Sequence, residues 1–328
     1  MTRKLTDTNS AAIAAEFVRA RTHAGSPAMG MVMTLVVVVD EENADSALDA
    51  ARAASHEHPA RVLAVVLGAA RGTPQVDAEV TVGAGWGGEM ALIRLHGEVV
   101  RHPESVVLPL LLPDSPVVAW WPVGAPADPA SDPLGRLAQR RITDTMTHAS
   151  ARSRALRQQC AAYAPGNTDL AWTRLTPWRA LLAAALDQHP LKVTGAAVTA
   201  ENANPSADLL VAWLASRLRV DVRPRTSDGP GITEVVLETA SGPIRISRTD
   251  GRLAVFTSPG NPDRPVALKR RDVPELLAEE LRRLDEDDVY AATAHYLHRG
   301  KLSRGRRTGT PASSRSSSRS VSRKGTPT

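Results

Sequence analysis

The sequence is poor in aromatic residues and nearly free of cysteine. Its 328 residues include one cysteine, Cys160, two phenylalanines, three tyrosines and six tryptophans. A lone cysteine excludes an internal disulfide and a zinc site built from several cysteines. The N-terminus has no apolar core typical of a signal peptide, and apolar runs such as residues 31–39 are too short to span a bilayer. We therefore expect a soluble protein of the cytoplasm.

Acidic residues are absent from the C-terminus, where the positive charge is concentrated. The formal net charge is +5, but residues 299–328 hold nine Lys and Arg and no acid. Removing these nine leaves 31 basic against 35 acidic residues, so the rest of the chain is mildly acidic. It gives no reason to expect a nucleic-acid-binding surface. The tail itself has eight serines and few apolar side chains, and we expect it to be disordered.

Apolar periodicity predicts an N-terminal α/β domain over residues 28–165, preceded by a helical segment at 1–27. A strand, a helix and a strand within about forty residues form a βαβ unit, which implies a parallel pair with a right-handed crossover. The sheet is therefore predicted to be partly parallel. The expected helices cover residues 9–23, 42–58, 98–112, 132–141 and 149–164, and the expected strands cover 31–40, 61–67, 75–82, 89–97, 116–121 and 142–145.

The second half, residues 166–298, is predicted to be an α+β domain with a largely antiparallel sheet. Thr176 and Pro177 open a helix, because threonine caps and proline is well suited to the first helical position. Several short strands then follow one another without intervening helices, which is typical of antiparallel pairing. The expected strands cover residues 192–199, 220–224, 232–238, 243–249 and 252–258, and the further helices cover 205–219, 273–284 and 286–298.

A glycine-rich stretch, GAGWGG at 83–88, formally matches the dinucleotide-binding pattern through Gly83, Gly85 and Gly88. That mechanism requires the loop to open a helix whose N-terminus holds the pyrophosphate. The following residues, EMALIRLH, resemble a strand at least as much as a helix, and the motif lies far from the first βαβ unit. The sequence therefore favours a hairpin connection over a nucleotide loop.

Other chemically capable residues have a structural interpretation. His56, Glu57 and His58 are spaced too closely on a helix to reach one metal ion. Cys160 lies in an alanine-rich helical stretch and is interpreted as a packed residue. The acids at 285–288 fit the first turn of a helix, whose dipole they oppose. We expect no catalytic residue, cofactor or metal, although a Ser/His/Asp triad assembles in space and one sequence does not exclude it.

Four of the six tryptophans lie in two short segments, SPVVAWWP and DLAWTRLTPWR. One interpretation places them in the core or at a domain interface, because large aromatic side chains are usually buried. Another makes some of them anchors for a partner protein, since Trp and Arg are enriched at interface hot spots. Adjacent tryptophans in a strand point to opposite faces, so they cannot enter the same layer. The candidate partner-interface residues are Trp120, Trp121, Pro122, Trp172, Arg174, Trp178 and Arg179.

These segments, in order, resemble the glucose-6-phosphate dehydrogenase assembly proteins, the OpcA family of actinobacteria and cyanobacteria. The matching stretches are EHPARVLAVV at 57–66, VVLPLLLPDSPVVAWWP at 106–122, RRITDT at 140–145 and DLAWTRLTPWRALLAAALD at 169–187. The resemblance covers roughly residues 28–298 and implies two α/β-type domains. It also implies a non-catalytic accessory protein that binds glucose-6-phosphate dehydrogenase, promotes its active oligomer and raises its activity, supplying NADPH through the oxidative pentose phosphate pathway.

The sequence departs from this family in two respects. Cyanobacterial members are associated with thioredoxin-linked control, which a single cysteine cannot support through an intramolecular disulfide. The basic tail lies beyond the family pattern. Two other functions stay open: a nucleotide- or sugar-phosphate-binding α/β enzyme, and a nucleic-acid binder that depends on residues 299–328 and on low salt. The enzyme would hold phosphate with the glycine loop or with Arg140, Arg141, Arg174 and Arg179.

Overall fold

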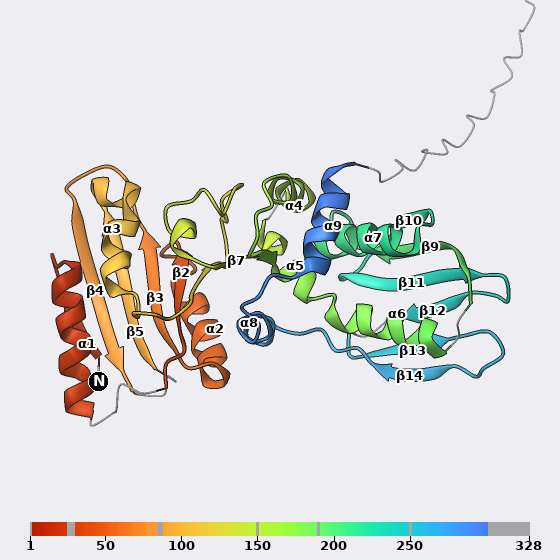
Figure 1. Ribbon diagram of the computed structural model, residues 1–328, viewed down its shortest axis with the longest axis horizontal. Coiled ribbons are helices and arrows are strands. Elements are labelled where there is room, and N and C mark those ends of the chain that lie inside the picture. Colours follow the sequence, from red (N-terminus) through yellow and green to blue (C-terminus); the bar gives the residue numbers. More distant parts are fainter. Residues whose placement is uncertain are drawn as a thin grey trace, which may run out of the picture.

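The computed structural model describes residues 2–24, 30–83, 88–148, 151–188, 191–248 and 251–300. Within these ranges the chain forms an eight-stranded and a six-stranded sheet, which lie at opposite ends of the long axis (Figure 1). Helices pack on both sheets and between them. No helix in the described ranges has both the length and the apolar character needed to cross a membrane. Most of the predicted C-terminal tail falls outside the described residues.

The first sheet confirms the predicted partly parallel arrangement, with the strand order β1-β4-β5-β3-β2-β6-β7-β8. Its strands are β1 (Thr2–Leu5), β2 (Met33–Val39), β3 (Ala60–Leu67), β4 (Gln75–Val82), β5 (Glu89–His96), β6 (Val117–Trp121), β7 (Arg140–Thr143) and β8 (Asn167–Asp169). Six neighbouring strands run parallel, in the sheet order β5-β3-β2-β6-β7-β8. At one edge, β4 pairs antiparallel with β5, and β1 pairs antiparallel with β4. Every residue of β2 is buried, as its uninterrupted apolar sequence predicts for a strand covered on both faces.

Helices cover both faces of this sheet. Helix α1 (Ser10–Ala24) packs Ile13 and Phe17 against one face, and α2 (Ala44–Glu57) packs its alanines against the other. The single helix predicted over 98–112 is wrong, because the segment forms three short helices: η1 (Gly97–Arg101), α3 (Pro103–Val107) and η2 (Leu108–Leu110). Pro103 and Pro109 account for the breaks, since proline cannot donate the hydrogen bond that a helix interior requires.

The helix predicted over 132–141 is also wrong. Only η3 (Gly135–Leu137) is helical there, and β7 begins at Arg140. A Cβ atom at position 135 would lie 1.8 Å from the carbonyl oxygen of Pro129, so the chain folds back here more closely than a side chain permits. Arg140 and Arg141, which the prediction placed at the end of that helix, are buried in the strand that follows.

The second sheet is largely antiparallel, as predicted, with the order β10-β9-β11-β12-β13-β14. Its strands are β9 (Val193–Ala200), β10 (Val222–Thr226), β11 (Ile232–Thr239), β12 (Ile244–Ser247), β13 (Leu253–Thr257) and β14 (Arg264–Ala267). Only β9 and β10 pair in parallel. The helices whose apolar residues share its core are α4 (Arg152–Ala161), α5 (Leu170–Thr173), α6 (Thr176–Gln188), α7 (Pro205–Leu218) and α9 (Asp288–His298).

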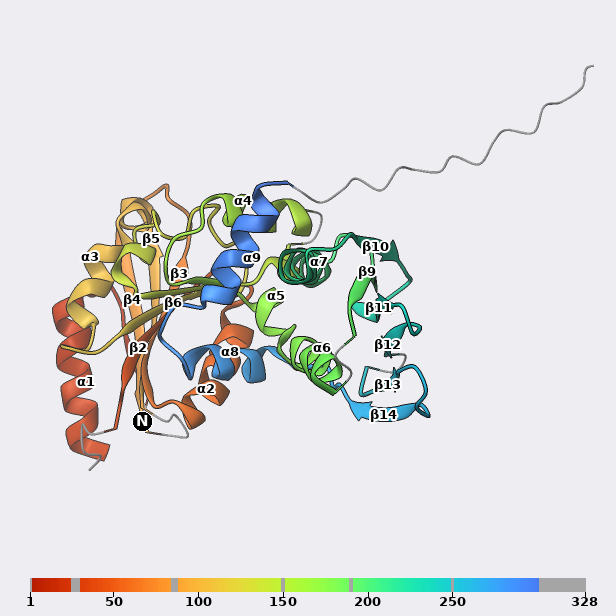
Figure 2. The ribbon, with the colours of Figure 1, turned by 45° about the vertical axis from the view of Figure 1, so that its right-hand side comes forward.

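Helix α8 (Val273–Leu281) follows the second sheet in the sequence but packs on the first. Figure 2 shows it beside α2. Leu276, Leu277 and Leu281 enter the same apolar cluster as β2, β3 and α2. A capping box between Asp272 and Glu275 fixes where the helix begins. The core of the first sheet therefore contains residues from both ends of the chain.

Candidate functional site

The first tryptophan pair lies in β6, near the middle of the first sheet. Trp120 faces the layer of α2 and α8, and Trp121 faces the layer of α1, so the predicted separation onto opposite faces is confirmed. Trp120 is 0% exposed and Trp121 is 3% exposed. Two large aromatic residues are adjacent here because β6 is covered on both sides.

The second pair belongs to the apolar core packed on the second sheet. The Trp172 indole Nε1 donates a hydrogen bond to Asp287 Oδ2 at 2.7 Å, and the Arg179 guanidinium carbon lies 3.8 Å from the centre of the Trp172 ring. Asp287 also caps α9 by accepting a hydrogen bond from the Tyr290 backbone amide. Trp172 therefore joins α5, α6 and the start of α9, and one of the acids at 285–288 holds it there.

All four tryptophans are thus core residues of this chain, since Trp172 is 1% exposed and Trp178 is 2% exposed. Of the seven candidate partner-interface residues, only Pro122, Arg174 and Arg179 are partly exposed. Contact between any of the seven and a partner stays a prediction.

Glu280 connects α8 to the edge of the first sheet. One of its carboxylate oxygens accepts hydrogen bonds from Arg140 Nη2 at 2.5 Å and Thr168 Oγ1 at 2.8 Å. The other accepts from Thr173 Oγ1 at 2.6 Å. The Arg140 and Glu280 side chains are only 4% and 9% exposed. A buried ion pair of this kind is tolerated because further hydrogen bonds satisfy the carboxylate.

Asp144 and Asp169 form a second buried cluster, at the carboxyl ends of β7 and β8. Asp169 accepts hydrogen bonds from the hydroxyls of Thr143 and Thr145 and from two backbone amides. Burial, and next the negative charge of Asp144, raise the pKa of Asp169 to about 6. Arg174 binds both oxygens of Asp144, at 2.8 and 2.7 Å. Both carboxylates are buried and hydrogen-bonded inside the chain.

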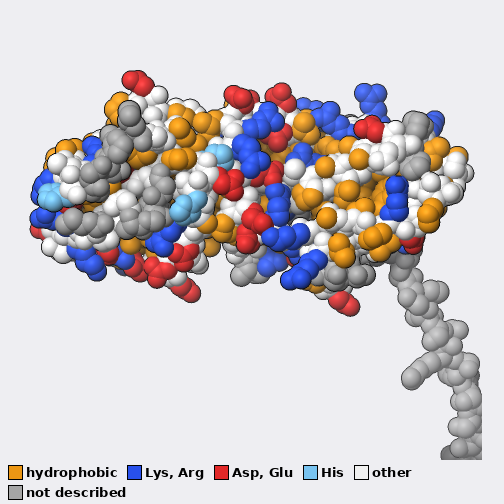
Figure 3. Space-filling view, turned by 90° about the horizontal axis from the view of Figure 1, so that it is seen from below, with side chains coloured by type: hydrophobic (Ala, Val, Ile, Leu, Met, Phe, Trp, Pro, Cys, Tyr) orange, Lys and Arg blue, Asp and Glu red, His pale blue; other side chains and the backbone are white. Residues whose placement is uncertain are grey.

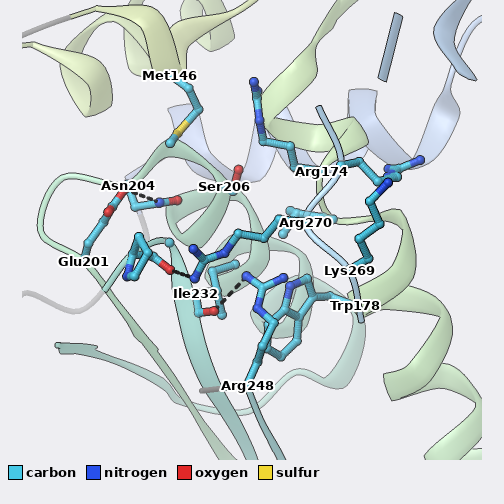
Figure 4. Close-up of a pocket in the computed structure, with 14 residues that line it drawn as sticks. Met146, Arg174, Trp178, Glu201, Asn204, Ser206, Ile232, Arg248, Lys269 and Arg270 are labelled. Carbon is cyan, nitrogen blue, oxygen red and sulfur yellow. Dashed lines mark hydrogen bonds between the residues drawn. The ribbon is translucent and has the colours of Figure 1, made fainter. Parts of the chain in front are cut away.

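A cationic cavity of about 240 Å³ lies beside this cluster (Figure 4). Among the described residues, five basic residues and one acid, Glu201, line it; the basic residues are Arg174, Arg248, Lys269, Arg270 and Arg271. Ser206 and Asn204 add polar groups, and Trp178 lies at one side. Among the described lining residues Met146 alone comes from the first half of the chain, and the others lie between Arg174 and Arg271 in the second half.

Arg248 is the most buried cation of this cavity, at 6% exposure. Its guanidinium donates hydrogen bonds to the carbonyl oxygens of Ile232 at 3.0 Å and Leu268 at 3.3 Å, and lies 5.1 Å from the centre of the Trp178 ring. Burial, and next the charge of Arg270, lower the pKa of Arg248 to about 10. Arg270 donates a hydrogen bond to the carbonyl oxygen of Pro230.

The arginines proposed for phosphate binding do not form one site. Arg140 pairs with Glu280, and Arg174 pairs with Asp144. Arg141 donates hydrogen bonds to Asn167 Oδ1 and to carbonyl oxygens, and Arg179 lies on the Trp172 ring. Of these four, only Arg174 lines the cationic cavity.

The remaining candidate residues occupy structural positions. Residues 84–87 of the glycine-rich stretch lie outside the described residues, but the strands β4 and β5 that flank it pair antiparallel, which confirms the predicted hairpin. His58 is the C-cap of α2, and within the described part of the chain no three His, Cys, Asp or Glu side chains gather as metal ligands. Cys160 is buried, and burial raises the pKa of its thiol to about 12, which keeps it protonated at neutral pH.

The sequence did not lead us to predict Arg248 and Glu280 as site residues, although each is a charged residue at a position where the pattern of its strand or helix calls for an apolar one. Arg248 continues the inward-facing alternation of Ile244 and Ile246 in β12, where an apolar residue is expected. Glu280 lies one turn after Leu276 and Leu277, on the apolar stripe of α8. A charged residue at a core position predicts a buried partner or a ligand, but its sequence position does not identify that partner.

Two family models match this chain over consecutive segments. One, described as the glucose-6-phosphate dehydrogenase subunit N-terminal domain, matches residues 51–161, and the other, the C-terminal domain of the same subunit, matches residues 165–294. No curated protein matches the sequence. Among solved structures, an oxidoreductase from Sinorhizobium meliloti matches with a TM-score of 0.45 and 9% identity, over 81% of this chain and 94% of that one. A likeness this distant says nothing about activity.

Proposed function

The chain belongs to the glucose-6-phosphate dehydrogenase assembly (OpcA) family, and we propose that it is a non-catalytic subunit that binds this dehydrogenase, promotes its active oligomer and raises its activity. The observation that carries the proposal is the pair of family matches, which cover both halves of the chain in order. The partner acts in the oxidative pentose phosphate pathway, so the complex would serve NADPH supply in the cytoplasm.

An activator must bind the active state of its partner more tightly than the inactive state, because equal affinity for both shifts no equilibrium. A rigid surface favours such discrimination, since little ordering is needed on binding. The buried networks around Glu280 and Asp169 support this requirement, because each holds segments from distant parts of the sequence in one arrangement.

We place the dehydrogenase contact over the junction between the two sheets. Pro122, Arg174 and Arg179 are the partly exposed members of the candidate set, and the buried tryptophans would act by fixing the backbone that carries them. Seen from below in Figure 3, basic and acidic side chains gather across the middle of the molecule. Charges of both signs at a contact surface favour orientation and selectivity.

The test is a steady-state NADPH assay of the cognate glucose-6-phosphate dehydrogenase, titrated with this protein, alongside size-exclusion chromatography of the mixture. We expect a saturable rise in rate or fall in apparent KM, together with co-elution. With both proteins folded, unchanged kinetics and separate elution would contradict the proposal.

A further inference from the structure

The cationic cavity holds more positive charge than its own carboxylates neutralise. Three of its five basic residues have an acid partner: Arg174 pairs with Asp144, Lys269 with Glu275 and Arg271 with Glu279. Glu201, the one acid among the described residues that line the cavity, pairs with Arg152. Within the described residues, Arg248 and Arg270 have no carboxylate within ion-pair distance.

Burying Arg248 in this position costs free energy, because a charge taken out of water needs a compensating partner. Its two carbonyl contacts satisfy only part of the guanidinium, and neither Arg248 Nε nor Arg270 Nε has a hydrogen-bond partner among the residues that the structure describes. The positive charge of Arg270 lies close enough to disfavour the charged form of Arg248. An anion between the two guanidinium groups would remove both penalties.

The chemistry of the walls narrows the class of anion. Guanidinium groups bind phosphate oxygens through paired N–H donors. Arg248 and Arg270 are therefore better suited to a phosphate than to an anion that cannot accept two parallel hydrogen bonds. Figure 4 shows Glu201 and Asn204 on the side of the cavity opposite Lys269. Carboxylate and amide groups there can accept hydrogen bonds from hydroxyl groups. The volume of about 240 Å³ suits a metabolite of a few carbon atoms rather than a dinucleotide.

We propose that this cavity is a binding site for a small phosphate monoester bearing hydroxyl groups, such as a sugar phosphate, with Arg248 and Arg270 holding the phosphate. The site requires no partner protein, so its existence does not rest on the proposed function. A ligand bound there would contact both Arg174, beside Asp144, and the 269–271 segment. Ligand binding would therefore affect side-chain contacts at the junction between the two sheets.

Isothermal titration calorimetry of the full chain tests this site, with glucose 6-phosphate as the probe and glucose and inorganic phosphate as separate arms. We expect glucose 6-phosphate to bind with a Kd below about 1 mM and glucose not to bind. Arg270→Gln, which removes one phosphate-binding charge at a half-buried position, should weaken binding at least about tenfold, which corresponds to about 1.4 kcal/mol. Inorganic phosphate binding as tightly as the ester would assign the site to free phosphate and overturn the sugar-phosphate class.

The matched control is Arg225→Gln, which removes the same charge from an exposed position of β10 and should leave the Kd unchanged. Lys269 also lines the cavity and is exposed, so Lys269→Gln provides a second cavity variant that should fold normally. Circular dichroism and thermal unfolding verify that each variant is folded. No saturable binding of glucose 6-phosphate, or equal weakening by Arg225→Gln, overturns the proposal. One further result would also overturn the proposal: the wild-type chain binds no probe, but the Arg270→Gln variant no longer co-elutes with the dehydrogenase. The cavity would then bind a group of the partner protein.

Discussion

Removing the carboxylate of Glu280 should destabilise the chain far more than removing a carboxylate whose ion pair is also short but whose partner is exposed to solvent. Glu280→Ala leaves the buried Arg140 guanidinium without its acid and the hydroxyls of Thr168 and Thr173 without their acceptor. Breaking a buried ion pair from one side typically costs about 3–5 kcal/mol. The matched control is Glu234→Ala, whose partner Arg245 lies 2.7 Å away but is 45% exposed, and its cost should be at most about 1 kcal/mol.

A double-mutant cycle separates the pair from its surroundings. Arg140→Met combined with Glu280→Met replaces both charges with apolar groups of similar length, so no charge is left buried alone. The double variant should be more stable than the sum of the two single losses predicts, with a coupling free energy of about 2 kcal/mol. Because Arg140 also donates to the carbonyl oxygen of Asp285 at 2.8 Å, recovery should be incomplete.

Urea unfolding followed by tryptophan fluorescence measures these changes, since Trp120 is buried in the core of the first sheet and Trp172 in the core of the second. The reasoning is refuted if Glu280→Ala shifts the unfolding midpoint no more than Glu234→Ala does. It is equally refuted if the losses of the two single methionine variants simply add in the double variant.

Three further changes test separate contacts. Trp172→Phe removes the indole donor to Asp287 and should cost about 2 kcal/mol in a urea titration, and an unchanged midpoint would show that this hydrogen bond contributes nothing. Trp178→Ala empties a buried site and should cost about 3–5 kcal/mol and reduce dehydrogenase activation; a variant that folds and activates normally would exclude a role for Trp178 in shaping the contact surface. Asp169→Asn tests the pH dependence. Because folding raises the pKa of Asp169 from 3.8 to about 6, this carboxyl favours the folded state below the unfolded pKa, and that stability is lost as the pH rises through 6. The deficit of the variant against the wild type should therefore shrink by about 2 kcal/mol between about pH 4 and 7, and a deficit independent of pH would contradict the raised pKa.

The strands and helices with strong periodicity could be predicted, and the exceptions have local causes. The continuous apolar runs of β2 and β3 and the alternation of β12 identified those strands. In contrast, β8 has three residues, Asn, Thr and Asp, and no apolar pattern. Its place beside β7 depends on the hydrogen bonds of Thr143 and Asp169. Nothing within three polar residues predicts them.

The candidate site was predictable only where neighbours in sequence are neighbours in space. The segment DLAWTRLTPWR contains both Trp172 and the Arg179 that lies on its ring, and its concentration of Trp and Arg was visible. The cationic cavity combines residues from Met146 to Arg271, and the partner of Arg140 lies 140 residues away in the sequence. Such pairings follow from the topology of two sheets, which one sequence does not specify.

The return of α8 to the first sheet has a consequence during synthesis of the chain. The last strand of that sheet ends at Asp169, but the leucines that complete its core lie at 276, 277 and 281. At the pace of a ribosome, the interval between them takes on the order of ten seconds. Throughout that time the nascent chain carries an uncovered apolar face over α2 and β2. The first sheet to be made is therefore among the last parts of the chain to be completed, and a chain that stops short of α8 would leave the ribosome as a substrate for chaperones and proteases.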